Sequence, residues 1–358
     1  MADTKEYLSG GRIQGSSTKV QTAPNTSWKE IGRYTVAGSS TGTITVRGLD
    51  SATSGTMTLK DNLMLVGRLD LASLSDIKMT FNGDSSGSNA NYAQRRSPNF
   101  NASTGGNSIT SADYIEIGDA MVDRNYFRAT IKNDDHEKYV IHHVLEEAGT
   151  AEDVQPDTED SVGKWANTAQ IHTITFTSSS GNFEIGSEIV VLGCDDDEAD
   201  SGTNAWQQTG VVLTSENLNT ITCSFTTKKY LMVEAYIPNV GSEYNHLRMQ
   251  FNGDTNARYV NRYSENGGSS GAASANYLTV NAGASRDSYM VFYIFAVDSE
   301  PKMVMCRTAV ENGRFNMYGK WYKQGGEEAL TSLRIYNSDG TNSAPLLSGS
   351  EIRVWGFD

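Results

Sequence analysis

The chain has 358 residues, and its 43 Asp and Glu outnumber its 29 Lys and Arg to give a formal net charge of −14. This acidity argues against a nucleic-acid-binding protein, because affinity for the phosphate backbone depends on a basic surface. The length allows two domains of ordinary size. With 34 Gly, 17 Tyr and only 6 Pro, the composition favours short strands joined by tight turns over helices.

The cysteines and the apolar segments indicate where the chain folds. Cys194, Cys223 and Cys306 are too few for a disulfide framework, so we expect folding in a reducing cytoplasm. No apolar segment follows a basic one near Met1, and no secretory signal is expected. The longest apolar run, Tyr289 to Val297, is far shorter than the about 20 residues of a membrane helix. We therefore expect no membrane insertion.

Residues 1–26 form the first predicted element, an extended N-terminal arm. This segment carries almost no large apolar side chains, and Gly10, Gly11 and Gly15 interrupt any hydrophobic period. Alone, such a segment cannot bury enough surface to offset the entropy lost on ordering. The hypothesis is that the arm lies on a neighbouring subunit or on the second half of the chain.

Residues 27–193 and 205–358 are predicted to be two copies of one domain, separated by an acidic linker at residues 194–204. Landmarks recur in the same order in both halves. They are Trp28 and Trp206, Leu63-Met-Leu-Val66 and Leu231-Met-Val233, Phe81-Asn-Gly-Asp84 and Phe251-Asn-Gly-Asp254, Tyr92 and Tyr259, Gly163-Lys-Trp165 and Gly319-Lys-Trp321, and Gly186-Ser-Glu-Ile189 and Gly349-Ser-Glu-Ile352. Insertions between landmarks fall in predicted loops, where they are best tolerated.

The second copy predicts the architecture most clearly. Its strand-like segments are 210–213, 220–225, 230–237, 246–251, 277–280, 289–297, 303–309, 315–321, 330–336 and 351–355. Turn signals such as Asn252-Gly253 and Asp339-Gly340 separate them. About ten short strands without a helical period indicate an antiparallel two-sheet sandwich. The predicted fold is all-β, with two tandem jelly-roll-like sandwiches after the arm.

Catalytic and metal-binding motifs are weak. The pattern G-x-S-x-G occurs at Gly38, Gly83 and Gly267, but each match lies in a turn between strands and not between a strand and a helix. His136, His142 and His143 lie beside acidic residues, yet adjacent histidines in one strand should face opposite sides of a sheet. The acidic linker lacks the spacing of a calcium loop. We therefore expect no enzyme, no catalytic residue, no cofactor and no metal.

Aromatic side chains are the remaining signal for binding. Tyr259, Tyr263 and Trp321, with Arg258 and Arg262, crowd the turns and neighbouring strands of the second copy. Tyr and Arg are enriched in binding surfaces, although Tyr is also an ordinary sandwich residue. These five residues are the candidate binding site, with host-surface glycan as the candidate ligand.

The repeat layout resembles accessory virion proteins of tailed phages and related viruses. The resemblance covers residues 28–358 and depends on the opening Trp, the Leu-Met-Val strand, the FNGD turn and the closing G-S-E-I segment. It implies a structural protein of a virus particle, such as a capsid decoration, vertex, turret or tail-associated component. Its expected partners are further copies of itself and other virion proteins. The alternative is a carbohydrate- or receptor-binding module of a tail fibre.

Overall fold

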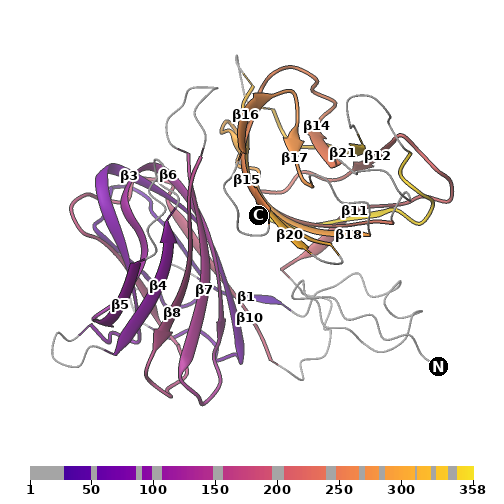
Figure 1. Cartoon of the computed structure of the whole chain (residues 1–358). Helices are drawn as coiled ribbons and strands as arrows, with labels where there is room; N and C mark the ends of the chain where they lie inside the picture. Colours follow the sequence, from indigo (N-terminus) through magenta and orange to yellow (C-terminus); the bar gives the residue numbers. More distant parts are fainter. Residues whose placement is uncertain are drawn as a thin grey trace, which may run out of the picture. The chain divides into compact units, whose positions relative to one another are not determined.

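A computed structural model describes most of the chain as strands (Figure 1). The described residues are 28–49, 55–85, 91–98, 107–147, 156–195, 205–238, 247–265, 271–281, 287–310, 313–323, 328–337 and 345–358. Within these ranges the chain forms 22 strands and no helix, and hence no helix long and apolar enough to cross a membrane. The predicted arm at 1–26 lies outside the described residues.

The strands belong to two compact units, which we call the first and second sandwich. The first contains β1 (Lys29–Thr35), β2 (Thr43–Val46), β3 (Asn62–Phe81), β4 (Tyr92–Pro98), β5 (Asn107–Ala112), β6 (Ile115–Lys132), β7 (Lys138–Glu146), β8 (Asp157–Trp165), β9 (Ile174–Ser178) and β10 (Glu188–Cys194). The second contains β11 (Gln207–Leu213), β12 (Thr220–Ser224), β13 (Tyr230–Ile237), β14 (Leu247–Phe251), β15 (Tyr259–Glu265), β16 (Gly271–Ala275), β17 (Leu278–Thr279), β18 (Ser288–Phe295), β19 (Lys302–Val310), β20 (Gly313–Trp321), β21 (Ser332–Asn337) and β22 (Glu351–Phe357).

The large sheets of the two sandwiches have the same strand order. In the first it is β1-β10-β3-β6-β7-β8-β4-β5, and in the second it is β11-β22-β13-β18-β19-β20-β15-β16. All the pairs are antiparallel, and a register shift interrupts the first pair of each sheet, between Glu30 and Gly32 and between Gln208 and Gly210. The repeat that the sequence predicts is therefore a repeat of topology.

The small sheets correspond as well. In the second sandwich β12, β21, β14 and β17 form a separate sheet. In the first, β9 pairs with β2 on one side and with the far half of β3, at Ile77–Phe81, on the other, and that half of β3 also meets the beginning of β6. The long strands β3 and β6 thus run through both sheets, whereas the second copy divides each of them into two strands.

Each sandwich closes over its own apolar core. Alternate residues point inward, as in β21, where Leu333 and Ile335 are buried between partly exposed neighbours. The two clusters contain 28 buried residues each, including Ile44, Leu65 and Phe176 in the first and Ile221, Val233 and Phe292 in the second. The prediction of an all-β fold built from antiparallel sandwiches is confirmed.

The first residues of the predicted acidic linker belong to the first sandwich. Cys194 ends β10, and Asp195 accepts a hydrogen bond from Lys60 Nζ at 2.8 Å. Asp358 accepts one from Lys228 Nζ at 2.6 Å at the end of the second sandwich. The repeated closing segment therefore extends to Asp195 and Asp358, and the rest of the linker, residues 196–204, lies outside the described residues.

Candidate functional sites

The FNGD segment makes the same tight turn in both copies. Asn82 and Gly83 have φ of 53° and 73°, and Asn252 and Gly253 have φ of 47° and 69°. Two consecutive positive φ values define the hairpin turn that an Asn-Gly pair favours. The backbone N–H of the Asp donates to the Phe carbonyl at 2.8 Å in both turns.

The Asn side chain of this turn ties it to the neighbouring chain. Asn82 Oδ1 accepts from the backbone N–H groups of His172 and Thr173 at 2.9 and 3.2 Å. Asn252 Oδ1 accepts from those of Thr331 and Ser332, both at 3.0 Å. The side-chain oxygen of each Asn thus accepts hydrogen bonds from two backbone N–H groups, as a backbone carbonyl would.

A Tyr and a Trp complete each corner. Tyr259 OH accepts from the N–H of Phe251 at 2.9 Å and donates to the carbonyl of Asp254 at 3.2 Å. The indole of Trp321 donates to Asp254 Oδ2 at 2.9 Å and stacks on Tyr259 with ring centroids 6.2 Å apart. In the first sandwich Tyr92, Trp165 and Asp84 make the same contacts, with the indole at 2.8 Å and the stack at 6.2 Å.

This corner corrects the predicted binding site. Tyr259 and Trp321 are fully buried, so they are not available to stack on a sugar. Tyr263 is half-buried and stacks on Phe315 with ring centroids 5.2 Å apart. Tyr259 and Tyr263 are four residues apart on β15, so both side chains point to the same, inward face of the sheet.

The two arginines of the predicted site lie in different surroundings. Arg258 Nη1 lies 3.5 Å from Asp254 Oδ2, so it supports the corner. Arg262 alternates with the inward-facing Asn261 and Tyr263, which places it on the outer face of β15. The five residues therefore do not meet on one exposed surface. Tyr259, Arg262 and Tyr263 lie on β15, where the sequence predicted no strand, and the alternation of that strand turns the two tyrosines inward.

The Asp254 carboxylate is held in its charged form. Burial opposes ionisation of this group, but hydrogen bonds from the Asn256 backbone and from the Trp321 indole, and the charge of Arg258, outweigh it and lower the pKa of Asp254. Burial also raises the pKa of the Tyr259 hydroxyl well above its usual range, so this group stays protonated and can donate.

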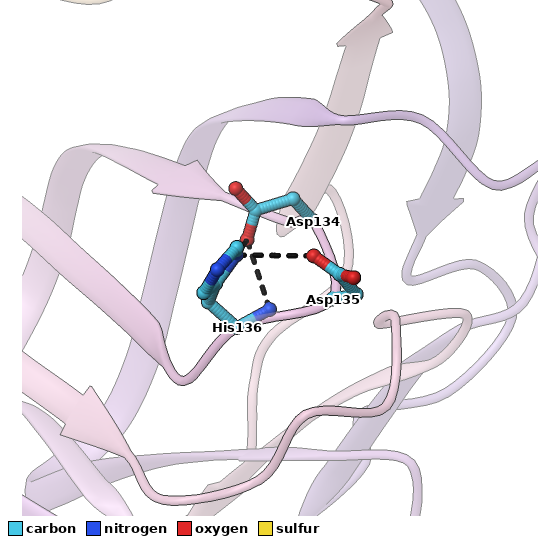
Figure 2. Close-up of side chains that lie close together, drawn as sticks. All are labelled: Asp134, Asp135 and His136. Atoms are coloured by element: carbon cyan, nitrogen blue, oxygen red, sulfur yellow. Dashed lines mark hydrogen bonds and ion pairs between the residues drawn. The ribbon is translucent and has the colours of Figure 1, made fainter.

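A cluster of possible metal ligands lies in the exposed turn between β6 and β7 (Figure 2). Asp134, Asp135 and His136 place their ligand atoms within 4.8 Å of one another. His136 Nδ1 is 3.2 Å from Asp134 Oδ1 and 3.0 Å from Asp135 Oδ1, and the His136 N–H donates to Asp134 Oδ1 at 3.1 Å. That backbone hydrogen bond is the main reason that the pKa of Asp134 is lowered.

A buried lysine explains this turn without a metal. Lys138 Nζ donates to the carbonyls of Asp134 at 2.6 Å and Thr168 at 3.2 Å, and also to that of His136. At the equivalent turn of the second sandwich, Lys302 Nζ donates to the carbonyls of Val297 at 2.7 Å and Glu300 at 2.8 Å. An ammonium already in place disfavours a second cation beside it. Sequence reasoning missed both lysines, although each follows a Glu closely and opens a strand.

Replacing Lys302 with Met is expected to lower the free energy of unfolding of the second sandwich by about 1 to 3 kcal/mol. The methionine side chain keeps the approximate shape but leaves the carbonyls of Val297 and Glu300 without their donor. Urea unfolding followed by circular dichroism measures the loss. The control is Lys323→Met, because Lys323 pairs with Glu328 at the surface and should change stability by less than about 1 kcal/mol. Equal effects of the two changes would contradict the role given to Lys302.

The histidines of β7 behave as the alternation predicts. His142 points inward and is fully buried, whereas His143 lies on the outer face and its Nδ1 is 2.6 Å from Asp160 Oδ1. They cannot bind one metal ion together. Of the serines in the G-x-S-x-G matches, Ser40 accepts from Asn182 Nδ2 at 3.4 Å, while Ser269 lies outside the described residues.

The first sandwich buries a charged cluster that the sequence did not predict. Arg96 Nε and Nη2 each donate to a carboxylate oxygen of Glu159 at 2.6 Å, and Arg96 Nη1 is 2.8 Å from Glu116 Oε2. His142 Nε2 lies 4.0 Å from Glu159 Oε1, and neither of its ring nitrogens has a hydrogen-bond partner among the described residues. The register of the strands makes Arg96 of the first sandwich equivalent to Tyr263 of the second. Arg96 lies opposite Ser161 in the β4–β8 pair, and Tyr263 lies opposite Met317 in the β15–β20 pair. The second sandwich thus has the Tyr263–Phe315 stack where the first has this cluster.

The stability of the first sandwich is expected to fall on acidification because of His142. Burial, with the nearby charges of His143 and Arg96, lowers the pKa of His142 to about 3 in the folded chain, against about 6.5 in an unfolded one. The unfolded state therefore binds an extra proton below pH 6.5, which costs up to about 1.4 kcal/mol of stability per pH unit towards pH 3. A His142→Leu variant removes this slope.

Urea unfolding of both proteins at pH 7, 6, 5 and 4 measures the difference in slope. Glu146 and Glu234, whose pKa values are raised to about 7 mainly by burial, act in the opposite direction, since their folded-state protons are lost as the pH rises. Both carboxyl groups are common to the two proteins and cancel in the comparison. Parallel stability curves for the wild type and the variant would contradict a buried, neutral His142.

Comparison with known proteins adds no family. No family model matches the chain, and no curated protein does. Among solved structures, the LG1-3 region of the laminin alpha2 chain is 8% identical, with a TM-score of 0.20 over 88% of this chain. The match covers 64% of that laminin chain. Domains LG4-5 of the mouse laminin alpha1 chain are 7% identical, with a TM-score of 0.17 over 90% of each chain. Scores at this level carry no argument about fold or function.

Proposed function

We propose that this chain is a structural protein of a virus particle, as a capsid decoration, vertex, turret or tail-associated component. It assembles through its N-terminal arm and through the surfaces of its sandwiches, and it is made in the host cytoplasm before it joins the virion. The observation that carries the proposal is the tandem repetition of one sandwich, with the same strand order and the same buried corner in both copies.

The repeated residues support a building role. Asp84 and Asp254, Trp165 and Trp321, and the lysines that cap the β6–β7 and β18–β19 turns all use their polar groups within the sandwich. Such residues make a rigid unit that can be used more than once, as a paving or projecting part of a particle requires. The net charge of −14 fits this role, because a negative exterior keeps particles soluble and apart.

The test is mass spectrometry of purified particles from cells in which the chain is made during infection. We expect the chain in stoichiometric amounts relative to other particle proteins, and antibody labelling should place it on the capsid or the tail. A chain that stays in the lysate and is absent from the particles would overturn the proposal.

The aromatic residues that suggested a glycan- or receptor-binding module are packed inside the second sandwich. Tyr259 and Trp321 are buried, and Tyr263 is packed against Phe315. The exposed tyrosines Tyr139 and Tyr236 are not among those residues and belong to different sandwiches.

A further inference from the structure

We propose that the outer face of β7 and β8 is a surface through which two copies of this chain associate (Figure 1). Three apolar side chains lie side by side on this face: Ile141 pairs directly with Val162, and Tyr139 is two residues along β7 from Ile141. Their exposed fractions are 54% for Tyr139, 47% for Ile141 and 49% for Val162. Such an interface rests on the proposed function as one of the sandwich surfaces used in assembly, and association of the purified chain tests it separately from the virion role.

The position of these residues makes their exposure informative. All three stand on regular strands in the middle of an eight-strand order, and not on a loop that could fold over them. Single exposed apolar residues are common, but a contiguous apolar patch on a sheet marks a surface that another protein covers.

The equivalent positions of the second sandwich are buried. The register of β19 and β20 places Met303, Met305 and Tyr318 at the positions of Tyr139, Ile141 and Val162. Their exposed fractions are 0%, 5% and 7%. The equivalent positions are therefore buried in the second sandwich and exposed in the first.

Charge complementarity identifies the partner as a second copy. On the outer face of β8, Val162 lies between Asp160 and Lys164. A second copy rotated about a two-fold axis that crosses the strands near Val162 brings its Asp160 to Lys164 of the first, and its Lys164 to Asp160. A patch with opposite charges at its two ends is self-complementary in this arrangement, as a two-fold interface requires.

Asp160 and Lys164 each have a partner within the chain that the second copy would replace. Lys164 pairs with Glu137 at 2.5 Å, and their side chains are 35% and 44% exposed; Asp160 pairs with His143 at 2.6 Å, with 35% and 13% exposed. A partly exposed pair such as Lys164–Glu137 is weak and can be replaced at an interface rim. A stable interface buries more than about 1,000 Å² in total. The three apolar residues are its centre, and the neighbouring outer positions of the sheet supply the remainder.

Sedimentation velocity of the full chain over a series of concentrations tests the proposal. Wild-type chain is expected to form a dimer, and Ile141→Lys is expected to raise the dimer dissociation constant at least tenfold. Val211→Lys is the matched control, because Val211 is 52% exposed on β11 of the second sandwich. It should associate as the wild type does. A wild-type chain that is monomeric at its highest soluble concentration, or equal loss in both variants, would overturn the proposal.

Two further variants test the axis and separate this face from the arm. Asp160→Lys and Lys164→Asp should each weaken the dimer, and the double variant should restore it, because the rotated charges match again. Failure of the double variant to recover rules out the two-fold arrangement. A chain that lacks residues 1–26 should still dimerise. Loss of the dimer on that deletion, with retention in Ile141→Lys, would assign association to the arm and overturn the inference.

Discussion

Arg96→Met is expected to lower the free energy of unfolding of the first sandwich by about 3 to 5 kcal/mol. Arg96 and Glu159 are both buried, and the guanidinium contacts Glu159 through two hydrogen bonds and Glu116 through an ion pair. The methionine leaves two carboxylates without their cation, and the cost of an unpaired buried charge exceeds that of a lost surface pair by several-fold. Urea unfolding followed by circular dichroism measures this loss.

The second sandwich supplies the control for this prediction. A variant that combines Arg96→Tyr, Glu159→Phe and Glu116→Thr places in the first sandwich the residues found at Tyr263, Phe315 and Thr279 of the second. It is expected to recover most of the loss, because well-packed apolar residues can replace a buried ion pair without net cost.

The surface pair Lys164–Glu137 provides a matched comparison in the same sandwich. Lys164→Met should cost less than about 1 kcal/mol. If Arg96→Met costs no more than Lys164→Met, the Arg96 cluster is accessible to water and is not a buried ion pair.

Trp321→Ala is expected to destabilise the second sandwich by about 3 to 5 kcal/mol. The change removes the stack on Tyr259 and the contact with Phe251, whose ring centroid is 5.6 Å away, and leaves Asp254 without its indole donor. Trp321→Phe separates the two contributions, because it keeps a ring but not the donor, and should cost about 1 to 2 kcal/mol. Calorimetry should show the loss in the transition of the second sandwich, and Trp165→Ala should lower that of the first.

This prediction also separates a packing role for Trp321 from the sugar-binding role that the sequence suggested. Val211→Ala, at an exposed position, should change stability by less than about 0.5 kcal/mol. A Trp321→Ala protein of wild-type stability that has lost binding to a glycan array would show that the indole is a ligand contact and would contradict its burial.

Sequence patterns predicted the strands that carry large apolar residues. The segments at 230–237 and 315–321 were expected and correspond to Tyr230–Ile237 and Gly313–Trp321. The Asn-Gly pairs correctly predicted the two hairpin turns, since few other sequences accept two positive φ values. In these places the local preference and the tertiary structure agree.

The sequence did not predict β15 and β16, the strands at the far edge of the large sheet of the second sandwich. The burial of the tyrosines on β15 was therefore not predicted either. Gly271–Ala275 contains only small residues, and Tyr259–Glu265 alternates its tyrosines with Val, Arg and Ser. Neither segment has the β-branched content of a strand signal. Because Tyr259–Glu265 was read as turn, Tyr259 appeared exposed, although the alternation of a strand would have pointed it inward.

The buried charged cluster could not be predicted from one chain. Arg96, Glu116 and Glu159 lie on three strands, and only the register of β4 against β8 brings the first and last together. Charged residues are usually at the surface, so the local sequence favours exposure. The pairing depends on the complete sheet and has no local signal.

The pairing of the first strand with the last strand in each sandwich determines when that sandwich can fold during synthesis. Lys29 pairs with Gly193, and Gln207 pairs with Gly356, so the first and last strands of each sandwich are hydrogen-bonded neighbours. Contacts between such distant residues form late and slow folding. A ribosome must therefore release Cys194 before the first sandwich can close and Phe357 before the second can. Until the first sandwich closes, strands that emerge from the second copy meet unpaired strands of the same order, and chaperone capture or a pause in translation would favour correct pairing within each copy.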